Sequence, residues 1–269
     1  MTNQQLRPFT LVELDRLHRA GEKIAMLTCY DASFATLAEL AGVDMLLVGD
    51  SLGMVIQGHA TTLPVTLDDI EYHVRAVARG TKRAMVVADM PFGTYQAGDA
   101  TAFANAARLL AAGGHMVKLE GGRVMHSTVR YLVDRGIPVC GHIGLTPQSV
   151  NQLGGYRVQG RSEDAANVLR EEAHLLQKAG AAVIVLEAIP ASLAATITSE
   201  LDVPTIGIGA GRECSGQVLV IYDALGIYPG HKARFVRNFM DGSASVADAL
   251  KRYVHDVKAG VFPAAEHSF

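Results

Sequence analysis

Four carboxylates stand at the ends of short apolar runs along the chain. The runs cover 45–50, 86–89, 116–120 and 183–187, and end in Asp50, Asp89, Glu120 and Glu187. Apolar runs without polar alternation are typical of parallel strands that are covered on both faces. The carboxyl ends of such strands meet at one edge of an α/β sheet or one mouth of a barrel, where these folds place their chemistry. We therefore expect one shared site.

The chemistry expected at this site is that of a divalent metal ion. Three or four carboxylates in one partly dry mouth would repel one another and raise each other's pKa values. A divalent cation removes this repulsion, and an all-oxygen ligand set favours Mg²⁺, which binds few carboxylates and keeps water or substrate oxygens. Lys118 shares a strand face with Glu120, and its charge suits a substrate carboxylate.

Each of these residues also has a structural interpretation. Asp50 and Asp89 could belong to turns or helix caps, Glu120 could pair with Lys118, and Glu187 could cap the helix that follows it. One shared site explains all four strand ends at once, so we favour it.

Other catalytic signatures are weak or absent. The glycine-rich segment 207–211 resembles a phosphate-binding loop, but no clear helix follows it, so the dinucleotide interpretation lacks its context. There is no Gly-x-Ser-x-Gly elbow, so Ser51 is expected to donate a hydrogen bond to a substrate rather than act as a nucleophile. His142 lies near a further strand end, where a structural and a functional role are equally consistent with the sequence.

The elements that must position these side chains alternate along the chain. Helices are predicted between most of the strands, which implies a parallel sheet. Eight strands favour a closed (β/α)8 barrel over a doubly wound open sheet. A short helix beginning after Thr10 precedes the first strand and could plug one end of the barrel. The predicted strands are 24–30, 45–50, 84–89, 116–120, 138–143, 183–187, 204–208 and 217–222.

The chain is expected to form one domain, 1–269, with loose tails at 1–9 and 262–269. The connection between the last two strands is too short for a full crossover helix. Two long loops, 51–66 and 144–161, are expected to be functional because structureless loops of this length are uncommon in compact domains.

Composition narrows the class of protein. The 269 residues are 49% hydrophobic and 19% charged, which permits a large core and argues against disorder. A net charge of −3 without a basic stripe argues against nucleic acid as a partner. No apolar run is long enough for a membrane helix. Three cysteines without a paired spacing, and a first segment without an apolar signal core, predict a cytoplasmic protein with reduced thiols.

Seven motifs, in this order, resemble those of the 3-methyl-2-oxobutanoate (ketopantoate) hydroxymethyltransferase family. The resemblance extends from about residue 24 to residue 239. One departure is Ser215, where the family usually has Asp. The motifs are the segments 26–31, 48–54, 89–92, 117–122, 141–149, 186–190 and 207–211.

The resemblance implies a (β/α)8 barrel and a role for each candidate residue. It places one Mg²⁺ per subunit at Asp50, Asp89 and Glu120, and makes Glu187 the catalytic base. The 2-keto acid would be held by the two aspartates together with further side chains, and a histidine lies near the site. These further residues are Ser51, Lys118 and His142.

The implied reaction transfers a one-carbon unit from 5,10-methylenetetrahydrofolate to 3-methyl-2-oxobutanoate, giving 2-dehydropantoate in pantothenate biosynthesis. A Mg²⁺-bound keto acid would lose its C3 proton to the base and react as an enolate. The residues do not identify a folate site, and the two long loops are expected to form or cover it. The family is also expected to form a homo-oligomer, commonly a decamer.

Two other functions stay open on the sequence. Another Mg²⁺-dependent barrel that forms an enolate, such as a pyruvate-type aldolase or a phosphoenolpyruvate-family lyase, would share the carboxylate cluster. A barrel without catalytic activity that binds a metal or ligand would also share it, but would not need Lys118 among the carboxylates.

Overall fold

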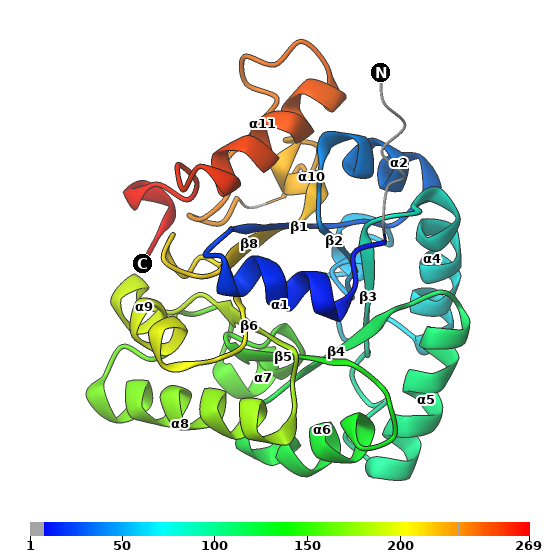
Figure 1. The fold of residues 1–269 in the computed structure, drawn as a ribbon, viewed down its shortest axis with the longest axis vertical. Coiled ribbons are helices and arrows are strands. Elements are labelled where there is room, and N and C mark those ends of the chain that lie inside the picture. Colours follow the sequence, from blue (N-terminus) through cyan, green and yellow to red (C-terminus); the bar gives the residue numbers. More distant parts are fainter. Residues whose placement is uncertain (1–7, 231) are drawn as a thin grey trace.

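The computed structural model describes residues 8–230 and 232–269, and the first seven residues of the predicted N-terminal tail lie outside this range. Eight parallel strands form a closed barrel in chain order (Figure 1). β8 pairs with β1 and closes the ring. The predicted (β/α)8 barrel is therefore confirmed. The strands are β1 (Ile24–Thr28), β2 (Met45–Val48), β3 (Met85–Asp89), β4 (Met116–Glu120), β5 (Val139–Gly144), β6 (Val183–Glu187), β7 (Thr205–Ile208) and β8 (Gly216–Leu219).

Helices surround the barrel, and among the described residues none is long and apolar enough to cross a membrane. The segment 209–215 between β7 and β8 contains no helix, as expected from its length. The α-helices are α1 (Leu11–Arg19), α2 (Ala32–Ala41), α3 (Leu52–Val55), α4 (Leu67–Gly80), α5 (Asp99–Ala111), α6 (His126–Val133), α7 (Val150–Leu153), α8 (Glu163–Ala179), α9 (Ala191–Glu200), α10 (Ile221–Ala224) and α11 (Val246–Lys258). The 3-10 turns are η1 (Arg123–Met125), η2 (Pro147–Ser149) and η3 (Ala265–His267).

Several helices begin at residues whose side chains cap the first turn. Asp31 accepts a hydrogen bond from the backbone of Phe34 at 2.9 Å, and Ser162 accepts one from Ala165 at 3.3 Å. Each cap satisfies a backbone N–H that has no partner within its own helix. β1 ends two residues earlier than predicted because Asp31 already begins α2.

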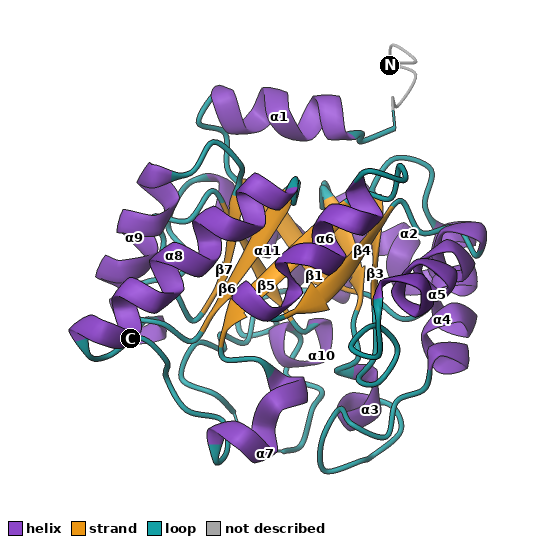
Figure 2. Cartoon of the chain, turned by 90° about the horizontal axis from the view of Figure 1, so that it is seen from below, coloured by secondary structure: helices purple, strands orange, loops and turns teal. Residues whose placement is uncertain are grey.

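The helix α1 closes the amino end of the barrel, as predicted. Figure 2 shows α1 across one end and α3, α7 and α10 at the other. Leu14 and Leu17 of α1 belong to the same buried cluster as Met26 and Met45, which lie on strands inside the barrel. The amino end is therefore filled with apolar side chains, and only the carboxyl end is left for a site.

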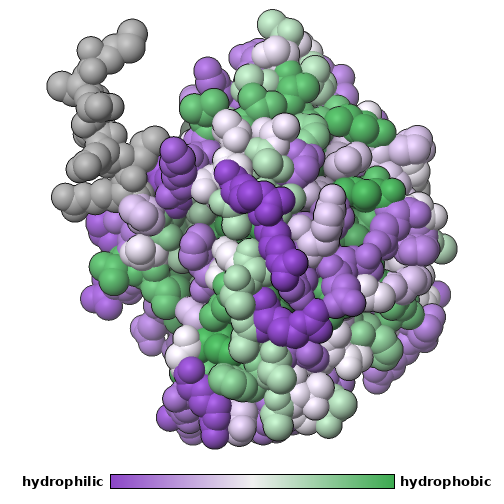
Figure 3. Space-filling view, turned by 90° about the vertical axis from the view of Figure 1, so that its right-hand side faces the viewer, coloured by the Kyte–Doolittle hydropathy of each residue, from purple (hydrophilic) through white to green (hydrophobic). Residues whose placement is uncertain are grey.

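Ion pairs connect neighbouring helices on the outer surface of the barrel. Arg108 of α5 pairs with Glu71 and Asp68 of α4 at 2.5 Å. On this face hydrophilic and hydrophobic residues are interspersed (Figure 3). Because the Asp68 side chain is 84% exposed, its part of this network contributes little to stability.

The C-terminal segment 262–269 packs on the barrel and is not a loose tail. The Phe262 side chain is buried, and its ring centroid lies 5.3 Å from that of Phe239. The backbone N–H of Ala191 donates to the carbonyl of Phe269 at 2.8 Å. An aromatic anchor and a backbone hydrogen bond to α9 therefore hold this segment.

Candidate active site

The structure brings the four predicted strand-end carboxylates together around one cavity at the carboxyl end of the barrel. The cavity has a volume of about 330 Å³, within the roughly 300–1,000 Å³ typical of small-molecule sites. Every candidate residue from the sequence lines it. These residues are Asp50, Ser51, Asp89, Lys118, Glu120, His142 and Glu187.

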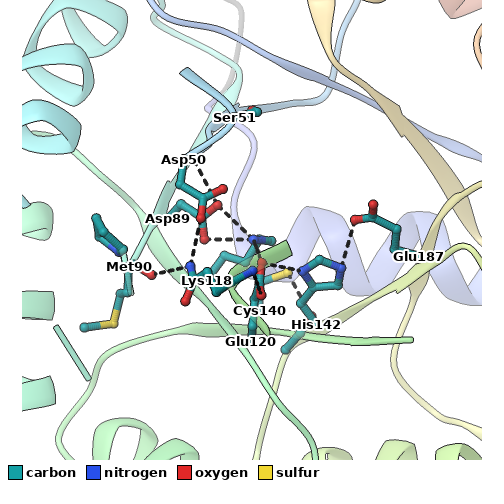
Figure 4. Close-up of polar contacts among 12 residues, drawn as sticks. Asp50, Ser51, Asp89, Met90, Lys118, Glu120, Cys140, His142 and Glu187 are labelled. Carbon is teal, nitrogen blue, oxygen red and sulfur yellow. Dashed lines mark hydrogen bonds and ion pairs between the residues drawn. The ribbon is translucent and has the colours of Figure 1, made fainter. Parts of the chain in front are cut away.

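Lys118 occupies the centre of the carboxylate cluster (Figure 4). Its Nζ donates to both Asp89 oxygens at 2.8 Å and lies 3.9 Å from Glu120 Oε1. Burial by itself disfavours the ammonium, but Asp89, Glu120 and Asp50 together raise the pKa of Lys118 above its ordinary value. The side chain therefore carries a fixed positive charge at the base of the cavity.

The two aspartates are buried and adjacent. The backbone N–H of Asp50 donates to Asp89 Oδ2 at 3.2 Å. Burial raises the pKa of Asp50, and the charges of Asp89 and Glu120 raise it further. Burial also raises the pKa of Asp89, although Lys118 opposes this shift. Both upward shifts mean that the charged forms of the two carboxylates are disfavoured at this place. A cation between the carboxylates would stabilise these charged forms.

His142 stands between two carboxylates. Its Nδ1 lies 3.4 Å from Glu120 Oε1 and its Nε2 lies 3.1 Å from Glu187 Oε2. Burial and Lys118 lower the pKa of His142, but Glu120 and Glu187 outweigh them and raise it to about 9. The protonated imidazole in turn helps to hold the pKa of Glu120 below its ordinary value, against the effect of burial. His142 thus forms an ion pair with each of the two carboxylates.

Gln148 and Tyr95 are site residues that the sequence interpretation did not identify. Gln148 donates its side-chain amide to Asp50 Oδ2 at 2.9 Å and to the Met90 carbonyl at 3.0 Å, and its backbone N–H donates to Glu120 Oε2 at 2.9 Å. Tyr95 Oη donates to Gln148 Oε1 at 2.7 Å and accepts from the Glu120 backbone at 3.1 Å. Gln148 lies in one of the seven motifs, which was the only signal for it.

Ser51 lies apart from the carboxylates (Figure 4). Its hydroxyl shares a hydrogen bond of 2.8 Å with Tyr30 Oη and makes no capping hydrogen bond to α3. Ser51 lines the cavity wall, and its hydroxyl is tied to the segment that follows β1 rather than to α3.

The donor set fits Mg²⁺ in its chemistry. Asp50, Asp89 and Glu120 offer only oxygen, and Glu120 Oε1 is buried without a hydrogen-bond partner in the described residues. No three His, Cys, Asp or Glu side chains of the described chain form a preassembled metal centre, and the Lys118 ammonium already binds Asp89. Mg²⁺ commonly takes one or two carboxylates and completes its shell with water or substrate, which this arrangement allows.

The two long loops both contribute to the cavity wall. Met54 and Thr62 come from the first loop, and Pro147 and Tyr156 come from the second. The Tyr156 hydroxyl contacts Met54 Sδ at 3.6 Å, so the loops meet over the site. By contrast, Ser215 bonds the backbone of Thr205 at 3.2 Å at the amino end of β7, and its departure from the family pattern does not reach the site.

Solved structures with a similar fold include a hydrolase and a lyase. Phosphonopyruvate hydrolase aligns with a TM-score of 0.60 and 14% identity, over 81% of this chain and 83% of its own. A 2,3-dimethylmalate lyase, described as a member of the PEP mutase/isocitrate lyase superfamily, aligns with a TM-score of 0.57 and 20% identity over 80% and 82%. At these identities the likeness establishes the fold alone.

Comparison of the sequence gives a much nearer match. The 3-methyl-2-oxobutanoate hydroxymethyltransferase of Azoarcus sp. is 61% identical over 99% of this chain and 98% of its own. The enzyme of the same name from Thiobacillus denitrificans is 62% identical over 97% and 100%. The family model described as ketopantoate hydroxymethyltransferase matches residues 8–265. The chain therefore belongs to the ketopantoate hydroxymethyltransferase family and is a transferase.

Proposed function

We propose that this enzyme transfers a hydroxymethyl unit from 5,10-methylenetetrahydrofolate to 3-methyl-2-oxobutanoate, giving 2-dehydropantoate, with one Mg²⁺ per subunit. Membership of the family supports the reaction. The observation that carries the mechanism is the arrangement of Lys118, the three buried carboxylates and the His142–Glu187 pair around one cavity.

The keto acid binds at the base of the cavity. The Lys118 ammonium offers its carboxylate a buried positive charge, and Ser51 lies on the cavity wall as a hydrogen-bond donor. Asp50 and Asp89 would hold Mg²⁺, with Glu120 directly or through a water. When bound, the ion would act as a Lewis acid on the keto oxygen.

Glu187 removes the C3 proton of the keto acid. Lys118 forms ion pairs with Asp89 and Glu120, whereas Glu187 lies beside His142 and its side chain is 13% exposed. His142 orients Glu187 at 3.1 Å. General-base catalysis needs such a positioned carboxylate within reach of the proton.

The transfer consumes one water. The methylene carbon leaves N5 and N10 of the folate, takes an oxygen from water and forms a new bond to C3. The C3 proton and one water proton pass to the two folate nitrogens, and the other water proton remains on the new hydroxyl. Tetrahydrofolate and 2-dehydropantoate are thus formed without any redox change.

A Mg²⁺-dependent assay with both substrates tests this proposal. Formation of 2-dehydropantoate that requires the metal, the keto acid and methylenetetrahydrofolate is the expected result. Equal turnover without the folate would instead favour a Mg²⁺-dependent aldolase or lyase, the second function that the carboxylate cluster allows. Location in the cytoplasm and assembly into a homo-oligomer, a decamer by resemblance to the family, stay predictions, and light scattering on the purified protein tests the second.

A further inference from the structure

Part of the cavity wall is not used by the chemistry at the carboxylate cluster. Four side chains there come from the segments that follow α7 and β8. They are Tyr156, Asp223, Tyr228 and Phe235. The cavity volume also exceeds what a short branched keto acid requires, since sites of this size hold drug-sized ligands. These four residues therefore line a part of the cavity that is large enough for a second, larger ligand.

Asp223 is the charged group in this part of the wall. It lies in α10, directly after β8, and is partly buried. Within the described residues, its carboxylate makes no hydrogen bond or ion pair. Burial raises the pKa of Asp223 to about 6, although Lys232 opposes the shift. A carboxylate that is partly desolvated and free of partners is available to accept hydrogen bonds from a ligand.

Three aromatic side chains line the same cavity as this carboxylate. Burial raises the pKa of Tyr156, and the charges of Glu187, Asp50 and Tyr228 raise it further, so Tyr156 is near both the carboxylate cluster and Tyr228. Tyr228 and Phe235 line the same cavity as Asp223 and come from the segment that follows α10. Rings placed in this way offer flat apolar surfaces to a planar heterocycle.

The position of Phe235 depends on a glycine at the end of β7. A Cβ on Gly209 would lie 2.7 Å from Phe235 Cδ1 and 3.1 Å from Phe269 Cε2, and the φ of Gly209 is +62°. Only glycine fits this close approach and this backbone conformation without strain. Phe269, at the packed C-terminus, thus lies beside the ring of Phe235. Packing around Gly209 therefore holds this part of the cavity wall in place.

We propose that Asp223 recognises the pterin ring of the folate substrate, with Tyr156, Tyr228 and Phe235 as the surrounding ring surfaces. This inference rests on the proposed function. The 2-amino-4-oxo ring of a reduced folate presents two adjacent donors, N3–H and the 2-amino group. The two oxygens of one carboxylate accept both, as in a bidentate carboxylate pair. The exposed Lys232 and Arg234 follow on the same segment and suit the anionic glutamate of the folate.

The first test replaces Asp223 by asparagine. Asp223→Asn keeps the shape but turns one acceptor into a donor, so the KM for methylenetetrahydrofolate rises about 10- to 100-fold, the range expected for hydrogen bonds to a charged group. Folate-independent deuterium exchange at C3 of the keto acid stays within about twofold of wild type, because the carboxylate cluster is unchanged. Asp202→Asn, which makes the same change of charge at an exposed position before β7, leaves both values unchanged.

A second test uses the wild-type enzyme and changes the folate. In a methylenetetrahydrofolate whose 2-amino group is replaced by methyl, one of the two donors is lost. Wild type then shows a KM about tenfold or more above that for the natural folate, and Asp223→Asn shows a smaller difference. This test holds even if the variant folds poorly.

The outcomes separate this inference from the proposed function. An unchanged folate KM in Asp223→Asn, or equal KM values for the two folates in wild type, overturns the pterin site while the transferase activity stands. Loss of C3 exchange together with folate binding also overturns it, because Asp223 would then support the keto acid site. Absence of any folate-dependent turnover in wild type would instead remove the proposed function itself.

Discussion

Gln148 donates its side-chain amide to Asp50 at 2.9 Å, which joins the β5 loop to a candidate metal ligand that follows β2. The backbone of the same residue donates to Glu120 at 2.9 Å. One residue therefore sets the positions of two carboxylates from different strands. Groups that orient metal ligands in this way commonly change metal affinity by about 10- to 100-fold when they are removed.

Gln148→Leu is expected to weaken Mg²⁺ binding by about tenfold or more, because leucine keeps the volume but leaves Asp50 Oδ2 without its donor. Calorimetric titration of Mg²⁺ into the keto acid complex measures the affinity without relying on turnover. The control is Gln152→Leu, an exposed residue of α7, which leaves the affinity unchanged. Equal Mg²⁺ affinities in Gln148→Leu and wild type would show that Asp50 needs no such support.

Tyr95→Phe removes the hydroxyl that donates to Gln148 at 2.7 Å and accepts from the Glu120 backbone at 3.1 Å. The buried Glu120 N–H then loses its acceptor, and Gln148 Oε1 keeps only the 3.4 Å hydrogen bond from Gln96, so the free energy of unfolding falls by about 1–3 kcal/mol. Urea denaturation measures it. Tyr72→Phe, at a residue 69% exposed on α4, should change it by no more than about 0.5 kcal/mol. A loss equally small in Tyr95→Phe would contradict the network.

Much of the fold could be predicted from the sequence because its signals are local. Apolar runs marked the strands, and Thr10 marked the start of α1, where its side chain accepts a hydrogen bond from the backbone of Glu13. The carboxylates were also predictable, since a strand places residues of equal parity on one face. The register between neighbouring strands could not be predicted, because it depends on pairing between segments that are distant in the sequence. It sets Lys118 beside Asp89 and His142 beside Glu120.

The sequence did not identify Gln148 and Tyr95 as site residues, because their roles depend on contacts between distant parts of the chain. Gln148 bonds Asp50, 98 residues earlier, and Tyr95 bonds Gln148, 53 residues later. A glutamine or tyrosine in a loop has no pattern that reports such a partner. The packing of the C-terminal segment is hidden for the same reason, because Phe262 packs on Phe239 and Tyr253 of preceding segments.

Phe262→Ala should lower the free energy of unfolding by about 3–5 kcal/mol, the usual cost of truncating a buried phenylalanine. Thermal or urea denaturation measures the change. The neighbouring Val261 is 54% exposed, so Val261→Ala provides a matched truncation that costs little. If Phe262→Ala were as mild as Val261→Ala, the segment 262–269 would be a loose tail after all.

Glu187→Gln should slow deuterium exchange at C3 of the keto acid by about 100-fold or more, the contribution of a positioned general base. The measurement needs Mg²⁺ and keto acid but no folate, so it isolates proton removal from transfer. Glutamine keeps the size and the contact with His142 while losing the basic oxygen. Glu163→Gln, in the exposed first turn of α8, serves as the control. Exchange at the wild-type rate in Glu187→Gln would exclude Glu187 as the base.

Asp223 gives the protein a pH dependence of stability that its asparagine variant lacks. Burial raises the pKa of Asp223 from 3.8 to about 6 in the folded chain. Between these values the folded state holds more protons than the unfolded state, so the free energy of unfolding falls as pH rises from about 4 to 6. With a discount for its partial exposure, the loss is about 1–2 kcal/mol.

Urea denaturation of wild type and Asp223→Asn at pH 4 and pH 7 isolates this group, because all other titrations are common to both proteins. Relative to wild type, the variant should gain about 1–2 kcal/mol in its free energy of unfolding between pH 4 and pH 7. A difference between the two proteins that is the same at both pH values would mean that Asp223 titrates in the folded chain as it does in water. The carboxylate would then not be desolvated, and the wall around it would be open to solvent rather than shaped for a ring.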